Sequence, residues 1–201
     1  YPRFNLLRWC LSNVLVYSIV VSLIKAISIL LLLLVIITGL VGVSDPNQNF
    51  APTFVWIIWW VGMAFASALV GNIWTFVNPW AAGFEWFESL FRRITGRQEL
   101  SLKLPYPEEL GVWPGLLLFF FFSWAELVYT EAAFPIRLAQ MTLAYSSITW
   151  IGMMLFGKEK WLSHGEAFSL VFGLLARFAP TEIRVVGGST CVSCTAACSN
   201  V

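Results

Sequence analysis

Long apolar runs separated by short polar segments are the dominant pattern along this chain. The apolar runs cover residues 14–43, 51–77, 112–129, 135–156 and 166–180. An α-helix rises about 1.5 Å per residue, so roughly 20 apolar residues cross the hydrocarbon core of a bilayer. The pattern therefore predicts an all-α, polytopic transmembrane protein with about five spans, built as one helical membrane domain over residues 1–180.

A shorter segment between the second and third runs is amphipathic. Asn78 followed by Pro79 is typical of a helix start, because Asn caps the first backbone N–H groups and Pro fits the first helical position. The aromatic residues that follow recur at helical spacing, whereas acidic and basic residues fall on other faces. These aromatic residues are Trp80, Phe84, Phe87 and Phe91. We expect an amphipathic helix over about 79–93 that lies in the membrane interface.

The basic residues of the connecting segments alternate along the chain. The N-terminal arm, the connector over 92–103 and the turn at 158–160 contain Lys or Arg, whereas the turns at 44–50 and 130–134 contain none. Basic connectors stay on the cytoplasmic side of a cell membrane. The alternation predicts a multi-pass protein of the plasma or inner membrane with a cytoplasmic N-terminus. Five crossings then place the tail, residues 181–201, outside the cell.

Composition supports the membrane assignment. Hydrophobic residues make up 59% of the 201 positions and charged residues 11%, with a mean hydropathy of +0.78, whereas soluble domains contain about 25% charged residues. This much apolar surface needs lipid or other membrane subunits as neighbours. The net charge of +1 excludes a basic nucleic-acid surface as the organising feature. The expected partners are therefore the lipid bilayer and other membrane protein subunits.

The C-terminal tail contains three closely spaced cysteines, Cys191, Cys194 and Cys198. Thiolates at this spacing can share a zinc ion or an iron–sulfur cluster, although a tetrahedral site needs four ligands. On the outer side of a membrane a disulfide is the simpler use. Covalent attachment or redox exchange is a third interpretation, and the sequence leaves all three open.

Ionisable residues inside predicted spans are costly, which makes them functional candidates. Glu126 lies near the outer end of the third predicted span and Arg177 near that of the fifth. At a shared depth they can form a structural ion pair near the headgroups or belong to a proton or ion path. Ser163 and Glu166, three residues apart, match a capping box and predict where the fifth helix begins.

The second predicted span has small residues four positions apart. The helix-packing candidates are Gly62 with Ala66 and Ser67 with Gly71. Small residues at this spacing let helix backbones approach closely in a membrane. No GxSxG, HExxH or phosphate-binding glycine-rich loop occurs in the sequence. The sequence therefore contains candidates for helix packing but no complete catalytic motif.

Three stretches carry a family resemblance: residues 45–55 leading to 78–80, residues 106–111 leading to 124–129, and residues 165–169 leading to 176–180. Together they resemble the polytopic bacterial and archaeal membrane proteins labelled fenitrothion hydrolase-like, over about Leu40 to Pro180. The resemblance implies a membrane-associated organophosphate hydrolase and supplies no catalytic residue to carry over. Members of that family are longer than 201 residues, so this chain is expected to be a short form or a piece of a longer protein.

Three functional hypotheses follow. The first is a non-catalytic integral membrane subunit that packs within a larger complex, which the small-residue helix faces and the aromatic content favour. The second is a membrane-embedded hydrolase or metal-dependent enzyme, which the family resemblance and the tail cysteines favour. The third is a small transporter or ion pathway built on Glu126 and Arg177.

Overall fold

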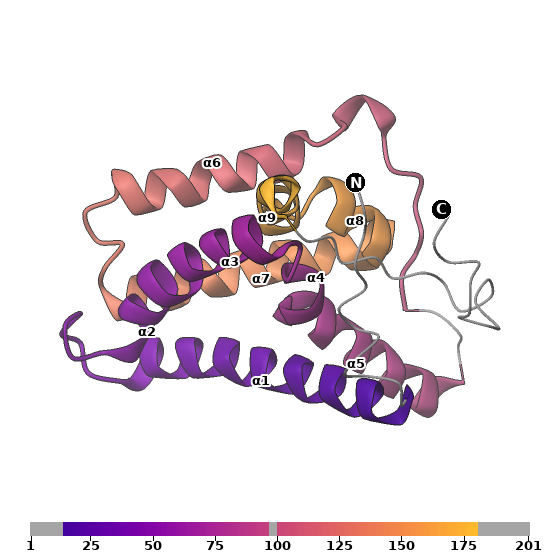
Figure 1. The fold of residues 1–201 in the computed structure, drawn as a ribbon, viewed down its shortest axis with the longest axis horizontal. Coiled ribbons are helices and arrows are strands. Elements are labelled where there is room, and N and C mark those ends of the chain that lie inside the picture. The colour runs from indigo at the N-terminus through magenta and orange to yellow at the C-terminus, as the bar shows by residue number, and fades with distance from the viewer. Residues whose placement is uncertain (1–13, 97–99, 181–201) are drawn as a thin grey trace.

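The computed structural model describes residues 14–96 and 100–180, and every regular element in these two ranges is a helix. Successive long helices run in alternating directions (Figure 1). The all-α prediction is confirmed for the part of the chain that the structure describes.

The first crossing is helix α1 (Val14–Val41), and a tight turn joins it to the second. The side chain of Asn49 fixes this turn: its Nδ2 donates to the carbonyl oxygens of Thr38 (2.8 Å) and Val43 (2.7 Å), and its Oδ1 accepts from the backbone N–H of Ala51 (2.9 Å). Asn49 is therefore both the cap of the next helix, α2 (Phe50–Pro52), and a partner for carbonyl groups at the end of α1.

The second crossing continues through η2 (Thr53–Val61), a π-helical stretch, into α3 (Gly62–Val70). At the end of η2 the backbone N–H of Gly62 donates to the carbonyl of Ile57, five residues earlier. π-Helices longer than one turn are rare and often occur at functional sites. The rings of η2 contact the centre of the protein, since Trp59 lies 4.6 Å from Phe168 and Trp60 lies 4.9 Å from Phe122 between ring centroids.

Helices α4 (Trp74–Val77) and α5 (Pro79–Thr95) follow, separated by Asn78. Asn78 Oδ1 accepts from the backbone N–H groups of Trp80 (3.0 Å) and Ala81 (3.1 Å), as its position before Pro79 predicts. One face of α5 packs into the protein. The other face exposes the large apolar residues Trp86, Phe87, Leu90 and Ile94.

A connector then leads past η3 (Glu108–Leu110) into the third crossing, α6 (Trp113–Leu127). This connector covers the C-terminal end of α7 (Pro135–Phe156). The backbone N–H of Leu102 donates to the carbonyl of Met154 (2.7 Å) and that of Leu104 donates to the carbonyl of Leu155 (2.8 Å). Helix ends leave such carbonyls without intrahelical partners, so the connector satisfies two of them.

The last three elements of the described part of the chain are α8 (Lys158–His164), α9 (Ala167–Leu175) and η4 (Ala176–Phe178). Ser163 lies inside α8 and donates to the carbonyls of Glu159 and Lys160 (both 2.9 Å), so it is not the cap of the next helix. Glu166 itself caps α9. The capping-box prediction was therefore right about a helix start at this point and wrong about which residue caps it.

Three helical stretches of the described chain are long and apolar enough to cross a membrane: Ser18–Val41, Phe50–Val70 and Glu108–Leu127. The predicted fifth span, 166–180, forms only a short apolar helix over Ala167–Phe178. At about 1.5 Å per residue it reaches roughly 18 Å, against about 30 Å of hydrocarbon. It is seen end-on in Figure 1, whereas α1, α6 and α7 lie in the plane of the view. The structure therefore supports a multi-pass membrane protein and does not show five spans.

The interior is largely aromatic. Its buried residues are Trp74, Trp80, Phe84, Tyr106, Met153, Trp161, Phe168 and Phe172. Large apolar side chains also cover the outside of the long helices, where Leu30, Phe65 and Phe120 are each more than 60% exposed. An apolar surface on this scale is stable in contact with lipid and not with water.

Candidate functional site

A cavity of about 630 Å³ lies between the long helices, with walls from α1, η2, α3, α6 and α7. Ligand pockets in proteins commonly measure about 300–1,000 Å³. Its lining residues, all of them in the described part of the chain, include no Asp, Glu, Lys, Arg or His. The cavity is therefore large enough for a ligand and has the composition of a site for an apolar one.

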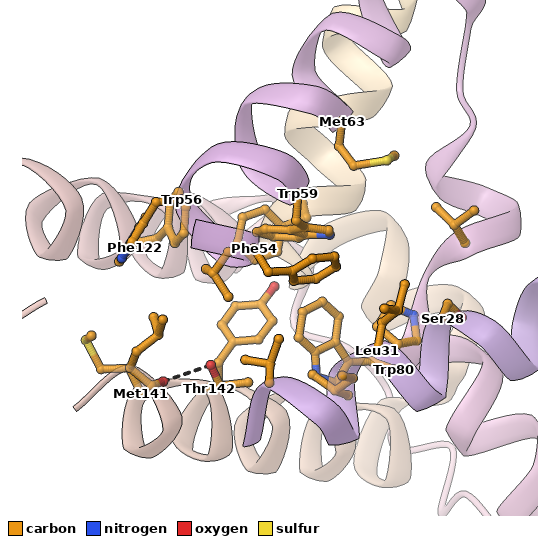
Figure 2. A pocket seen from close by; sticks show the side chains of 18 of the residues that line it. Ser28, Leu31, Phe54, Trp56, Trp59, Met63, Trp80, Phe122, Met141 and Thr142 are labelled. Atoms are coloured by element: carbon orange, nitrogen blue, oxygen red, sulfur yellow. Dashed lines mark hydrogen bonds between the residues drawn. The ribbon is translucent and has the colours of Figure 1, made fainter. Parts of the chain in front are cut away.

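The walls of the cavity differ in character. Helices α1 and α7 contribute mainly aliphatic side chains, whereas η2 and α6 contribute mainly aromatic ones. Figure 2 shows Phe54, Trp56, Trp59 and Phe122 on one side, with Leu31, Trp80, Met141 and Thr142 across from them. The space between them is lined by apolar side chains from several helices.

The few hydroxyl groups in the lining direct their hydrogens away from the cavity. Ser28 Oγ donates to the carbonyl of Lys25 (2.8 Å), and Thr142 Oγ1 donates to the carbonyl of Leu138 (2.8 Å). The hydroxyl of Tyr145 donates to the carboxylate of Glu166. A polar ligand would lose hydrogen bonds to water on entering such a space, whereas a hydrocarbon chain would not.

A buried carboxylate lies next to the cavity lining at Trp74 and Tyr145. Glu166 is fully buried, and three side chains donate to it: Trp74 through Nε1 (3.2 Å), Asn78 through Nδ2 (3.4 Å) and Tyr145 through its hydroxyl. Trp74 and Tyr145 also line the cavity. Glu166 thus fixes the orientation of two cavity side chains that come from α4 and α7.

The same carboxylate begins helix α9. Its oxygens accept from the backbone N–H groups of Phe168 (3.0 Å) and Ser169 (2.7 Å). A carboxylate at a helix N-terminus satisfies donors that have no intrahelical partner and interacts favourably with the helix dipole. Five donors therefore meet one buried side chain, and all five are neutral groups.

A second polar cluster joins α1, α5 and α8. Lys25 Nζ lies 2.6 Å from one carboxylate oxygen of Glu85, and Lys158 Nζ lies 2.9 Å from the other. The three side chains are 26%, 32% and 25% exposed, respectively. We call these residues the Lys25–Glu85–Lys158 cluster. Glu85 gives an ionic partner to a lysine that the apolar first crossing would otherwise hold alone.

The cluster changes the proton affinity of its members outside the first crossing. Burial by itself raises the pKa of the Glu85 carboxyl, but the hydrogen bonds and charges of Lys158 and Lys25 outweigh it, so this pKa lies below its usual value. Burial lowers the pKa of Lys158, and Glu85 and Glu159 together raise it above its usual value. Both shifts favour the charged forms of Glu85 and Lys158 at neutral pH.

The ionisable pair predicted from the sequence is not brought together. Glu126 is half-buried near the end of α6. Arg177 is exposed in η4. Both residues are described, and no ion pair joins them. Their positions in the sequence predict the same depth in the membrane only if residues 166–180 form a fifth span.

The predicted packing residues divide between the inside and the outside of the protein. Ser67 and Gly71 are buried where α3 meets α9 and η4. Gly62 is exposed, and a Cβ atom added there would meet nothing within 4 Å. Ala66 is half-buried. Of these four described residues, Ser67 and Gly71 are therefore the two that lie in the interior.

The predicted metal or disulfide site, Cys191, Cys194 and Cys198, lies outside the described residues. Within the described ranges, no group of three or more His, Cys, Asp or Glu residues is arranged to hold a metal ion. The question of a zinc ion, an iron–sulfur cluster or a disulfide in the tail stays a prediction.

Sequence reasoning did not identify the site that the structure shows. Trp74 and Asn78 reach Glu166 from 92 and 88 positions earlier in the chain, and Tyr145 from 21 positions earlier. No local pattern indicates such contacts. The one available signal was a Glu at a helix start in a chain with few charges.

Comparison with known proteins gives no family for this chain. No protein-family model, no curated protein and no solved structure matches it. The comparisons therefore do not support the family resemblance over Leu40 to Pro180. The structure supports only the membrane assignment that the resemblance implied.

Proposed function

We propose that this chain is a multi-pass membrane protein that binds the hydrocarbon chain of a lipid-like ligand in the cavity between its crossings. One observation carries the proposal: a cavity of about 630 Å³ whose lining has no charged side chain and whose hydroxyl hydrogens are bonded to the protein. Burial of a hydrocarbon in such a site is favourable by about 0.8 kcal/mol per CH₂ group where the alternative is water. Where the alternative environment of the hydrocarbon chain is lipid, the favourable free energy comes from close van der Waals contact with the aromatic and aliphatic walls.

We propose four crossings: α1, the α2–η2–α3 segment, α6 and α7. Helix α7 has 22 residues, which is about 33 Å of helix. It packs along α1, and it also contacts α2 and α5. Four crossings return the chain to the side on which it began. The prediction of an extracytoplasmic tail depended on a fifth crossing, so this arrangement replaces it with a cytoplasmic one.

The charges at the two ends of the bundle support this orientation. The end that carries α5 and α8 contains Arg92, Arg93, Lys103, Lys158 and Lys160. At the other end, the turns after α1 and α6 contain Asp45 and Glu131, and the exposed Arg137 pairs with Glu131 (2.8 Å). Basic residues concentrate on the cytoplasmic side, so we assign the α5 and α8 end to the cytoplasm.

A cavity-filling substitution tests the proposal. Ala144 on α7 lines the cavity and is exposed at its opening, whereas the neighbouring Leu143 is exposed and does not line it. A long-chain alcohol with a photoreactive group in its chain serves as an uncharged probe. We expect it to label cavity residues such as Met63 and Met141 in the detergent-solubilised protein, and Ala144→Trp to reduce that labelling by about tenfold.

Leu143→Trp is the matched control, because it adds the same ring to the same helix outside the cavity. It is expected to leave the labelling of Met63 and Met141 unchanged. Labelling that is spread evenly over the outer surfaces of α1 and α6, with no response to Ala144→Trp, would show that the cavity holds no ligand.

A second candidate function is a subunit of a larger membrane complex, and the outward-facing Gly62 favours it. Gly62 lies on an exposed face of α3, and residues 14–96 and 100–180 place no atom within 4 Å of a Cβ added there. Glycine in such a position permits close approach of another helix. Gly62→Leu is then expected to remove a stoichiometric partner from the protein purified in mild detergent. The hydrolase and transport hypotheses rest on the family resemblance and on single residues.

A further inference from the structure

One positively charged side chain belongs to the cavity-facing stripe of α1. Lys25, Ser28 and Leu32 are separated by three and four positions, so they lie on one face of the helix. Ser28 and Leu32 line the cavity. Lys25 therefore lies three residues, or about 4.5 Å along the helix axis, beyond the last hydroxyl of the cavity wall. At that point α5 and α8 meet α1 through the Lys25–Glu85–Lys158 cluster.

The cluster carries an excess of positive charge. Two lysine ammonium groups share the single carboxylate of Glu85, one on each oxygen. Glu159 also pairs with Lys158 (3.2 Å), but its side chain is 85% exposed, so water screens this contact strongly. An unbalanced, half-buried positive charge next to an apolar space is suited to a ligand with an anionic end and an apolar end.

We infer that the ligand of the cavity is an anionic phospholipid, with an acyl chain between the helices and its phosphate at Lys25 and Lys158. This inference rests on the proposed function, because it assigns the headgroup of the ligand whose chain the cavity holds. A phospholipid of the surrounding leaflet is available at this depth. Lys25 lies inside the candidate span Ser18–Val41, toward the end that we assign to the cytoplasm, and Lys158 follows α7 at the same end. A lysine near the cytoplasmic surface raises the affinity for an anionic lipid about five-fold.

Native mass spectrometry of the full chain in a neutral detergent tests the headgroup. The protein is titrated with phosphatidylglycerol and with phosphatidylcholine of identical acyl chains. We expect one phosphatidylglycerol to bind at least tenfold more tightly than phosphatidylcholine. Lys25→Met and Lys158→Met, made singly, each leave Glu85 with one lysine partner, and each is expected to reduce the preference about five-fold.

Arg93→Gln is the charge-matched control. It removes one positive charge from the exposed side of α5, away from the cavity lining. It is expected to leave the preference unchanged. An equal loss in Arg93→Gln and Lys25→Met would mean general attraction to a basic surface, and that result would overturn the inference.

The outcomes separate this inference from the proposed function. Equal binding of both phospholipids, with Ala144→Trp weakening both, would refute the anionic headgroup and keep the cavity as an apolar site. Displacement of phosphatidylglycerol by an equimolar amount of oleate would identify a single-chain acid as the occupant and refute the phospholipid. Binding that does not respond to Ala144→Trp would refute the proposed function itself.

Discussion

The carboxylate of Glu166 connects segments that are far apart in the sequence. It accepts hydrogen bonds from Trp74 and Asn78 near α4, from Tyr145 on α7 and from the first turn of α9. A buried donor that loses its acceptor costs about 1–3 kcal/mol. Because several donors depend on this one side chain, its replacement affects three elements together.

We expect Glu166→Gln to lower the free energy of unfolding by about 2 kcal/mol and Glu166→Ala to lower it by more. The amide keeps one acceptor oxygen, whereas Ala keeps none. Thermal unfolding in detergent, followed by tryptophan fluorescence, measures both changes. Glu159→Gln is the control, because that carboxylate is 85% exposed, and it should change stability by less than about 0.5 kcal/mol. Equal effects of the Glu166 and Glu159 variants would contradict the assigned role of Glu166.

The lowered pKa of Glu85 predicts how the stability of the protein depends on pH. Its pKa is lowered in the folded protein, so the stability it contributes is present above the ordinary carboxyl value of 4.5 and is lost as the pH falls through the lower folded value. We expect the protein in detergent to lose stability below about pH 4.5. In Glu85→Gln this acid dependence should be smaller. An unchanged acid dependence in Glu85→Gln would assign it to other carboxylates.

At the scale of elements, close packing of α8 on α7 depends on one glycine. A Cβ atom at Gly152 would lie 2.2 Å from a ring atom of Trp161. The stacked rings of Trp161 and Phe156 (6.0 Å between centroids) hold the indole in that place. The contact explains why the turn at Gly157 brings α8 directly back against the end of α7.

Gly152→Ala is therefore expected to lower the free energy of unfolding by about 1–3 kcal/mol, because the added methyl group overlaps the indole. Gly62→Ala is the matched control. It adds the same methyl group to a helical backbone with no atom within 4 Å, and it should be neutral or stabilise the protein by up to about 1 kcal/mol. Paired thermal unfolding curves in one detergent give the comparison. A neutral Gly152→Ala would contradict the packing of α7 against α8.

The elements also show which parts of the fold could be predicted from the sequence. Local chemistry predicted the start of α5, because the Asn78 cap and Pro79 act within three residues. The fifth span was predicted from hydropathy alone, which does not distinguish lipid contact from burial. In the structure Ala167, Phe168 and Phe172 are buried inside the protein, so the apolar character of α9 serves the core. The cavity could not be predicted, because its walls come from helices whose pairing no local pattern specifies.

At the scale of the whole molecule, the number of crossings decides what each end of the bundle faces. Three stretches qualify by length and composition. In the arrangement that we propose, α7 is a fourth crossing, and the basic residues of α5 and α8 share one end. With four crossings, the turn after α1 and the turn before α8 lie on opposite sides. This separation depends on parity and does not depend on the details of packing.

Single cysteines in a background without the four native ones test this arrangement. We expect Asn47→Cys, in the turn after α1, to react with a membrane-impermeant thiol reagent on intact cells. Glu159→Cys, which is exposed in α8, should react only after the cells are permeabilised. Restoring Cys194 alone then separates four crossings from five, because the tail is cytoplasmic after four and external after five. Reaction of Cys194 on intact cells would restore the fifth crossing, and with it the oxidising environment in which a disulfide among the tail cysteines is favoured.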